Sequence, residues 1–219
     1  MYKQTYEQKA PEYFSSARRE ILPLLPANGD RVLELGCGNG ATLRWIKELG
    51  RFAEFWGIEL TEVAGATASA VLDHVIIGDV EDCAIEFPES HFELILCLDV
   101  LEHLRDPWAV MDRLSRWLCP GGVVVASIPN VRYYTVLRDL VFKGSFRYEE
   151  MGILDRTHLR FFTRESGMEL MRTGGLQNIQ VLLHPAEIKG MRNLANSATF
   201  GVFRDMLSWQ LLIRGEKVV

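Results

Sequence analysis

Residues 32–49 read VLELGCGNGATLRWIKEL, and this stretch decides the fold. The apolar run at 32–35 predicts a short strand, and apolar residues at helical spacing predict a helix over 41–49 that Gly50 ends. The turn between them, GCGNG at 36–40, is rich in glycine. Glycine lets a backbone approach a ligand closely, and a helix N-terminus offers N–H groups to polar or anionic atoms. The stretch therefore predicts a strand, a ligand-binding turn and a helix.

Strand and helix patterns alternate along the chain around this stretch. We expect strands at 32–35, 55–60, 74–77, 92–98, 123–128, 179–183 and 209–213, and helices at 12–25, 41–49, 62–72, 107–118 and 164–172. The continuous apolar run at 92–98 is typical of a strand buried on both faces of a sheet. The order predicts an α/β fold with a doubly wound, mostly parallel sheet of seven strands. In such folds ligands bind at the carboxyl ends of the strands.

The segment 129–163 interrupts this alternation and is too long for a plain connection. It holds a helical pattern at 131–142 and a polar, aromatic stretch at 146–162. We interpret the segment as a substrate lid, inserted after the fifth strand of a single domain that spans 1–219. The lid is expected to order over bound ligands.

Composition excludes several classes of protein. Lys and Arg number 24 and Asp and Glu 29, so the net charge is −5 and a nucleic-acid partner is disfavoured. No uninterrupted apolar run is long enough for a membrane span, and the beginning of the chain lacks an apolar signal segment, which predicts a cytoplasmic protein. The four cysteines form no CxxC pair and the five histidines no metal-ligand spacing, so we expect reduced thiols and no metal site.

Two acidic residues follow predicted strands at regular intervals. Glu59 stands 19 residues after Gly40, and Asp79 stands 20 residues after Glu59. A carboxylate at the end of the second strand can accept hydrogen bonds from two ribose hydroxyl groups. The glycine turn and the two acids together predict a nucleoside-type ligand.

With these motifs, VLELGCGNG, WGIELTE, GDVED and FELILCLDVLEHLRDPW, the chain resembles the class I S-adenosylmethionine-dependent methyltransferases over nearly its whole length. The resemblance implies a Rossmann-like methyltransferase fold with an antiparallel last strand. It implies S-adenosyl-L-methionine as the cofactor and S-adenosyl-L-homocysteine as the product. It also implies that Gly36, Cys37 and Gly38 lie under the methionine part of the cofactor, while Glu34 orients the loop or the amino group.

The same resemblance implies roles for residues after the next strands. Glu59, with Leu60 beside it, would bind the ribose, and Asp79, with Val80 beside it, would meet the adenine. The other expected cofactor contacts are Leu98, Asp99 and Tyr13, although Tyr13 is equally explained as a packing residue. Arg18 and Arg19 either reach the cofactor carboxylate or belong to a solvated helix face.

Two other functions remain open at this point. Gly36, Gly38 and Ala41 also satisfy the GxGxx(G/A) pattern of NAD(P)-dependent oxidoreductases. A catalytically inactive methyltransferase fold could serve as a binding or regulatory protein. The acids Glu34 and Asp79 favour a methyltransferase over both alternatives.

Candidate catalytic and acceptor-binding residues lie near the fourth strand and in the lid. His158, within DRTHLRFF at 155–162, or His103, within LEH, could take a proton from the acceptor, and either could equally be structural. We expect an acceptor pocket shaped by Arg132, Tyr133, Tyr134 and Arg156, with an ion-pair lattice that fixes the lid as the alternative. The DRTHLRFFT segment resembles one found in bacterial methyltransferases of surface-polysaccharide or quinone-type metabolism. We therefore expect a small-molecule or metabolite-linked acceptor. The sequence leaves the oligomeric state open between a monomer and a homodimer.

Overall fold

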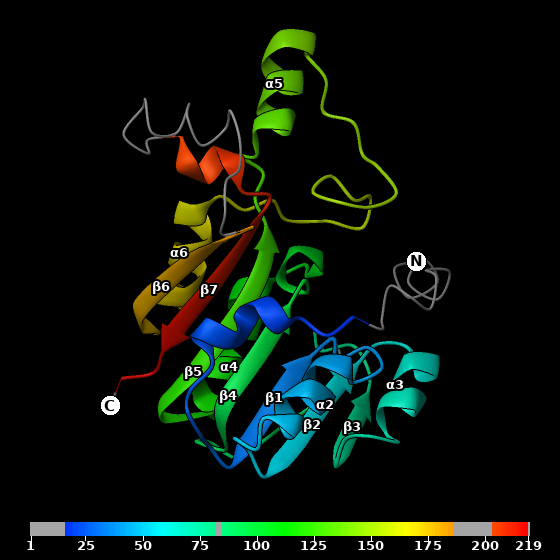
Figure 1. Cartoon of the computed structure of the whole chain (residues 1–219), viewed down its shortest axis with the longest axis vertical. Coiled ribbons are helices and arrows are strands. Elements are labelled where there is room, and N and C mark those ends of the chain that lie inside the picture. The colour runs from blue at the N-terminus through cyan, green and yellow to red at the C-terminus, as the bar shows by residue number, and fades with distance from the viewer. Residues whose placement is uncertain (1–15, 82–84, 186–202, 219) are drawn as a thin grey trace.

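The computed structural model describes residues 16–81, 85–185 and 203–218. It contains a seven-stranded sheet in the order β3-β2-β1-β4-β5-β7-β6 (Figure 1). The strands are β1 Arg31–Leu35, β2 Glu54–Glu59, β3 His74–Ile77, β4 Phe92–Leu98, β5 Leu118–Pro129, β6 Gln177–His184 and β7 Gln210–Glu216. β7 pairs antiparallel with β5 and with β6, and the other pairings are parallel. The predicted fold class, including the antiparallel last strand, is confirmed.

The α-helices are α2 Ala41–Glu48, α3 Glu62–Ala68, α4 Pro107–Trp117, α5 Tyr134–Lys143 and α6 Arg164–Thr173, and the 3-10 helices are η2 Arg19–Leu24, η3 Leu101–His103 and η4 Arg204–Leu207. α2 and α3 pack on one face of the sheet and α4 and α6 on the other, while α5 stands away from it (Figure 1). N-terminal capping residues explain where two of these helices begin. Asp106 accepts a hydrogen bond from Ala109 N before α4, and Thr163 forms a capping box with Ser166 before α6.

β4 is buried on both faces, as its sequence, apolar except for the half-buried Glu93, predicts. Leu94 and Leu96 pack with α2 and α3 on one face, while Ile95 and Cys97 pack with α4 and α6 on the other. Successive side chains of a strand point to opposite faces, so a strand in the middle of a two-sided core needs an apolar residue at every position. The core therefore lies in two layers, one on each side of the sheet.

The predicted helix at 12–25 is wrong over its described part. Residues 16–18 are irregular and only the short 3-10 helix η2 follows, while 12–15 lie outside the described residues. Pro23 has no backbone N–H and restricts the residue before it, so a regular α-helix cannot continue through this position. Instead, the irregular residues 16–18 and the 3-10 helix η2 cross the sheet.

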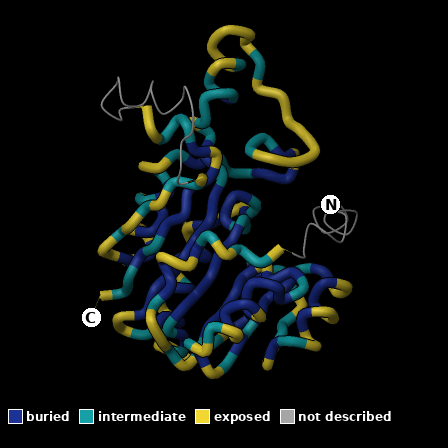
Figure 2. Tube along the Cα trace, in the orientation of Figure 1, coloured by how far each residue is buried: buried dark blue, intermediate teal, exposed yellow. Residues whose placement is uncertain are grey.

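The segment 129–163 leaves the carboxyl ends of the strands and returns as a long loop after α5 (Figure 1). α5 begins three residues later than the helical pattern at 131–142 predicts, and its one buried side chain is Val136. Figure 2 shows that the outer part of the segment is exposed, while the part that returns toward α6 is mostly buried or half-buried. Among the described residues, no helix is long and apolar enough to cross a membrane.

Candidate functional site

A cavity of about 990 Å³ opens at the carboxyl ends of β1, β2, β3 and β4. This is large enough for a nucleoside cofactor together with a small acceptor. The predicted cofactor residues that the structure describes all line it: Glu34, Gly36, Cys37, Gly38, Glu59, Leu60, Asp79, Val80, Leu98 and Asp99. Tyr13 lies outside the described residues. Strand order alone brings these residues to one place, because every one of them stands at or near the end of a parallel strand.

The glycine turn is fixed against β2. The N–H groups of Gly36 and Cys37 both donate to the carbonyl oxygen of Ile58, at 2.8 and 3.2 Å. Gly36 has a φ of +63°, and a Cβ atom there would lie 2.7 Å from a methyl carbon of Val100. Position 36 therefore requires glycine for its backbone conformation and for its lack of a side chain. The turn at 36–40 is therefore a fixed backbone surface on which a ligand can lie, and we call it the glycine floor.

Glu59 supports this floor from the end of β2. Its Oε2 accepts a hydrogen bond from Gly38 N at 3.0 Å, and its Oε1 accepts from the N and Oγ1 of Thr61, both at 2.9 Å. A carboxylate offers about four acceptor positions, so one remains for a ribose hydroxyl. The two ribose hydrogen bonds that the sequence suggests would require the Thr61 hydroxyl to turn away. Thr61 does not line the cavity but positions Glu59, a role that the sequence does not reveal.

Asp79 and Val80 form the far end of the cavity, after β3. Asp79 Oδ1 accepts a hydrogen bond from Glu81 N at 2.8 Å, and Val80 is buried. Glu81 in turn accepts hydrogen bonds from Arg105 N at 3.0 Å and Asp106 N at 2.8 Å. These bonds tie the loop after β3 to the start of α4. The arrangement places a carboxylate beside apolar surface, which suits a planar base with an exocyclic amino group.

Asp99 sits at the centre of a network that joins four distant parts of the chain. Its φ of 57° is unusual for a residue other than glycine. The guanidinium of Arg18 pairs with its Oδ2, and the Gln210 amide donates to its Oδ1. Arg18 Nη2 also donates to Ser127 Oγ at 2.9 Å, and so does Gln210 Nε2 at 2.5 Å. The network fixes a strained residue at the rim of the cavity.

Arg18 thereby belongs to the cavity lining, whereas Arg19 is exposed. The sequence left both arginines undecided, and it gave no role to Ser127 or Gln210. One sequence feature could have indicated Ser127 and Gln210, namely a polar residue within an apolar strand. Ser127 interrupts VVVASI and Gln210 interrupts SWQLLI.

Glu34 is a buried carboxyl at the end of β1, 3% exposed. Burial raises its pKa to about 8, the charge of Arg18 works against this, and the charge of Glu59 adds to it. Its Oε2 has no hydrogen-bond partner among the described residues. A buried carboxyl with an unsatisfied oxygen, facing a cavity, fits a cationic ligand group that would restore the charge. The ammonium of a methionine moiety is such a group.

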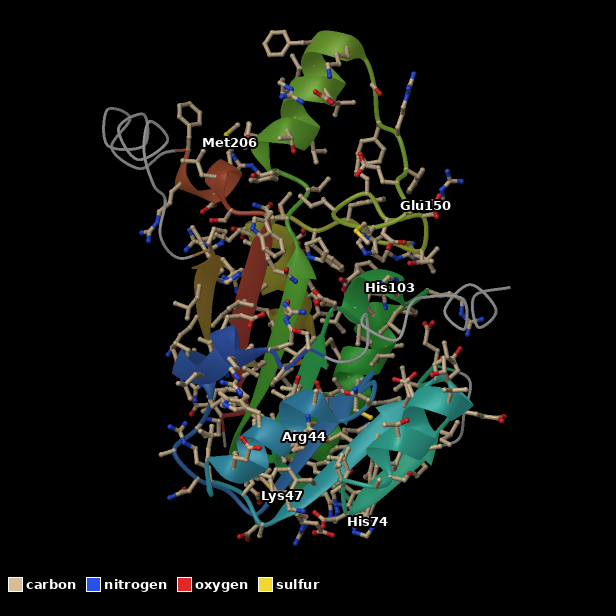
Figure 3. All side chains as sticks on the ribbon, turned by 45° about the vertical axis from the view of Figure 1, so that its right-hand side comes forward. Arg44, Lys47, His74, His103, Glu150 and Met206 are labelled. Carbon is tan, nitrogen blue, oxygen red and sulfur yellow. The ribbon has the colours of Figure 1, made fainter. Side chains whose placement is uncertain are left out.

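Glu102, His103 and His158 form a second group, on the lid side of the cavity. His103 Nδ1 lies 3.1 Å from the carbonyl oxygen of Thr157, and His158 Nδ1 lies 2.9 Å from that of Ile153. A carbonyl oxygen only accepts, so each Nδ1 carries a proton, and in a neutral ring Nε2 would be the nitrogen with the lone pair. The two rings are 4.7 Å apart. Figure 3 shows His103 below the loop that carries Glu150.

Glu102 lies under the two rings and is 1% exposed. Its backbone carbonyl oxygen accepts hydrogen bonds from Leu159 N at 2.8 Å and from Arg160 N at 3.0 Å. These bonds hold the returning part of the lid segment against η3. Neither carboxylate oxygen has a hydrogen-bond partner among the described residues, and burial raises the pKa to about 8. One ligand atom each from Glu102, His103 and His158 lie within 4.8 Å of one another, a spacing that a metal ion could use. The absence of a metal site stays a prediction from the sequence.

The residues expected to shape the acceptor pocket do not line this cavity. Arg132 is exposed, and the rings of Tyr133 and Tyr134 contact each other at the base of α5. Arg156 points to solvent and pairs with Glu150 at 2.9 Å. The acceptor side is lined instead by Met151, Gly152, Ile153, Asp155 and Leu159 of the lid segment and by Trp209 before β7. Side-chain direction in an irregular loop has no period that a sequence could reveal.

Comparison with known proteins adds independent information. A sequence model of a protein family described as "Methyltransferase domain" matches residues 6–181. A ubiquinone biosynthesis O-methyltransferase from Xanthomonas campestris pv. campestris (strain B100) is 36% identical over 175 residues, which are 73% of this chain and 69% of that protein. The protein of the same name from Xylella fastidiosa (strain 9a5c) is 29% identical over 168 residues, 70% of this chain and 66% of that protein. The chain spans about two thirds of the length of these relatives.

Solved structures share the fold at low identity. A SAM-dependent methyltransferase from Archaeoglobus fulgidus superposes with a TM-score of 0.69 over 96% of both chains at 16% identity. A possible histamine N-methyltransferase from Thermotoga maritima gives a TM-score of 0.63 over 94% of this chain and 91% of its own, at 22% identity. At these identities the similarity establishes the common architecture.

Proposed function

The chain belongs to the methyltransferase-domain family, and from this premise we propose that it methylates a hydroxyl group of a small, quinone-type aromatic acceptor. Membership agrees with S-adenosylmethionine as the cofactor and with an active methyltransferase, so the nicotinamide and regulatory alternatives are set aside. The identity of the acceptor goes beyond what family membership establishes. It is supported by relatives named ubiquinone biosynthesis O-methyltransferase and by the chemistry of the lid side of the cavity.

The residues at the strand ends fit the cofactor. The unsatisfied buried oxygen of Glu34 would receive its ammonium, and Arg18 would receive its carboxylate. Glu59 would bind the ribose through its remaining acceptor position, and Asp79 the adenine amino group. The glycine turn excludes side chains from the floor. When bound, the cofactor would supply a methyl group on a positively charged sulfur, and this sulfur would keep the bonding electron pair when the methyl group passes in line to the acceptor.

The chain's own task is then to hold the acceptor in line, to exclude water and to receive a proton. His158 is placed for the last of these, because it lines the cavity on the lid side and, in a neutral ring whose Nδ1 donates to the carbonyl oxygen of Ile153, Nε2 is the nitrogen that would accept the proton. His103, with its ring beside that of His158, would assist by orientation or as a second proton carrier. The aliphatic and thioether side chains of Ile153, Leu159 and Met151 would cover the faces of an aromatic ring.

One observation carries this proposal: a single cavity has the predicted cofactor residues at one end and both candidate histidines at the other. The test is methyl transfer from radiolabelled S-adenosylmethionine to a panel of catechols, simple amines and nucleotide sugars. We expect label in the catechols, at the hydroxyl oxygen. Label confined to amines or sugars would overturn the acceptor class while leaving the enzyme class intact.

Three expectations from composition stay predictions alongside this proposal. They are a cytoplasmic location, the absence of a nucleic-acid partner and a monomeric or homodimeric state. The single-domain organisation and the lid role of 129–163 also remain predictions that rest on the sequence.

A further inference from the structure

The acceptor end of the cavity has one large aromatic side chain in its wall, that of Trp209. Among the described residues that line the cavity, it is the only one with a Phe, Tyr or Trp side chain. Trp209 is 43% exposed. Pockets for small molecules are lined mostly by apolar and aromatic side chains, and aromatic rings pack favourably against one another. A half-covered indole in a cavity wall is therefore a surface that an aromatic ligand can complete.

The backbone around Trp209 is held in place by Asn130, which directly follows β5 and is fully buried. The Nδ2 of Asn130 donates hydrogen bonds to the backbone carbonyl oxygens of Asp205 at 2.7 Å and of Ser208 at 2.8 Å. The backbone N of Asn130 donates to the carbonyl oxygen of Trp209 at 3.0 Å. These three bonds join the end of β5 to the residues just before β7. Because its backbone is already ordered, the indole loses little further freedom when a ligand binds.

The contact between the indole and its protein neighbour leaves room for a ligand ring. The rings of Trp209 and His184 lie 5.4 Å apart with an interplanar angle of 77°, an edge-to-face arrangement. Such a contact covers at most one face of the indole. Together with the exposure of the side chain, this leaves aromatic surface of Trp209 without a covering group in the described structure.

Trp209 also lies near the rim where cofactor and acceptor would meet. The next residue, Gln210, lines the cavity and donates a hydrogen bond to Asp99 at this rim. The lid segment contributes the aliphatic and thioether side chains of Met151 and Ile153 to the same cavity. Apart from the two imidazole rings, the indole is therefore the aromatic surface that the described lining offers to an acceptor.

We propose that Trp209 is a specificity-determining residue, whose indole packs against the ring of the acceptor and selects aromatic acceptors over saturated ones. This inference deepens the proposed function and rests on it. The competing role is purely structural, in which the indole only packs on His184 and supports the start of β7. A structural role predicts a change in stability without a change in the affinity for the acceptor, so the two roles can be separated.

The first test is steady-state kinetics with catechol at saturating S-adenosylmethionine. Trp209→Leu keeps an apolar side chain but removes the aromatic surface, so the KM for catechol should rise by about tenfold with kcat nearly unchanged. Trp209→Phe keeps an aromatic ring, and its KM should stay within about threefold of that of the unaltered chain. Trp108→Leu is the matched control, because Trp108 is 41% exposed on α4 but does not line the cavity. Its KM should be unchanged.

Protection from acrylamide tests the contact directly. Of the five tryptophans, all of them in the described structure, only Trp108 and Trp209 are exposed, so these two should dominate fluorescence quenching by acrylamide. Catechol added to the complex with S-adenosylhomocysteine should reduce quenching in the unaltered chain and in Trp108→Phe. The reduction should be absent in Trp209→Phe. The saturated analogue cis-1,2-cyclohexanediol, at the same concentration, should give little protection in any of these proteins.

Three outcomes would overturn the inference. They are an unchanged KM in Trp209→Leu, unchanged acrylamide quenching of Trp108→Phe when catechol is added, or equal protection by catechol and by the saturated diol. If Trp209→Leu does not fold, Trp209→Phe and the protection assay still decide between the two roles. Catechol that is methylated with the same KM by Trp209→Leu overturns this inference alone, whereas failure of the unaltered chain to methylate any catechol overturns the proposed function as well.

Discussion

The carboxylate of Glu59 accepts a hydrogen bond from the backbone N–H of Gly38 at 3.0 Å, so the same side chain supports the glycine floor and faces the cavity. Glu59→Gln keeps the shape but loses the charge and turns a donor toward Gly38 N–H. Because hydrogen bonds to charged groups contribute about 1.5–3 kcal/mol, S-adenosylmethionine binding should weaken by about tenfold or more. Calorimetric titration measures this. Glu62→Gln, on the exposed start of α3, is the control and should bind normally.

Cofactor binding should release a proton from Glu34. With a pKa of about 8 this carboxyl is mostly protonated at neutral pH, and a cationic ammonium placed beside it favours the carboxylate. Titrations at neutral pH in buffers of different ionisation enthalpy report the number of protons released. Glu34→Gln should lose this release, and comparing the two proteins removes any exchange by the ligand's own amino group. Equal proton release in both would contradict the role of Glu34.

Stability should fall as pH rises through the range set by Glu102 and Glu34. Each has a pKa of about 8 in the folded chain against an ordinary value of 4.5, so the folded state keeps a proton that the unfolded state loses. Each carboxyl then costs about 1.4 kcal/mol per pH unit between these values and nothing further above them. Thermal unfolding of Glu102→Gln should show a shallower fall from about pH 5 to about pH 8. Glu150→Gln, at an exposed position, should keep the original slope.

His158→Ala should separate chemistry from binding. Loss of a proton acceptor typically lowers turnover by about 10²-fold or more, while the cofactor end of the cavity is untouched. Steady-state kinetics with a catechol and calorimetry with S-adenosylhomocysteine measure the two effects. Arg156→Ala should leave turnover nearly unchanged because its side chain faces solvent and pairs with Glu150. Full activity of His158→Ala would eliminate it as the base.

Activity should survive a chelator if the histidines act as proton carriers. Glu102, His103 and His158 have a spacing that a metal ion could use, so the two roles make different predictions. Turnover after treatment with EDTA, followed by readdition of zinc or magnesium, distinguishes them. Loss of activity that a metal restores would assign these side chains to a metal and would correct the sequence prediction.

Limited trypsin digestion should report closure of the lid segment. Lys143 and Arg147 lie in its exposed part and are the expected cleavage sites. S-adenosylhomocysteine together with a catechol should slow cleavage there if the segment orders over both ligands. Unchanged cleavage with both ligands at saturation would count against closure.

The sequence predicts the floor of the site well because each residue there is fixed by its position in a parallel strand. Gly36, Glu59 and Asp79 each follow an apolar run, and the carboxyl ends of parallel strands meet at one edge. The residues that sequence missed depend on distant pairing. Arg18 and Gln210 reach Asp99 across 81 and 111 positions, and no local period records such contacts.

The remaining differences have local causes. Apolar spacing at 12–25 suggests a helix, but Pro23 removes a backbone donor, and over the described residues 16–25 only the short 3-10 helix η2 forms. In the lid, density of aromatic and basic residues suggests a pocket wall, yet Arg156 points to solvent while Ile153 and Leu159 line the cavity. Composition marks such a segment as unusual without saying which side of it faces inward.

Gln210 lies on the antiparallel strand β7, so the hydrogen bonds of its amide can form only late in the synthesis of the chain. Arg18 and Asp99 are synthesised before Gln210, whose amide bonds both Asp99 and Ser127. Gln210 begins β7, which is the last element of the chain in the described structure. A nascent polypeptide that stops short of β7 already contains the glycine floor and both acids, but Asp99 and Ser127 at the rim lack the two hydrogen bonds from Gln210. Newly synthesised molecules should therefore retain the cofactor more tightly once β7 has paired between β5 and β6.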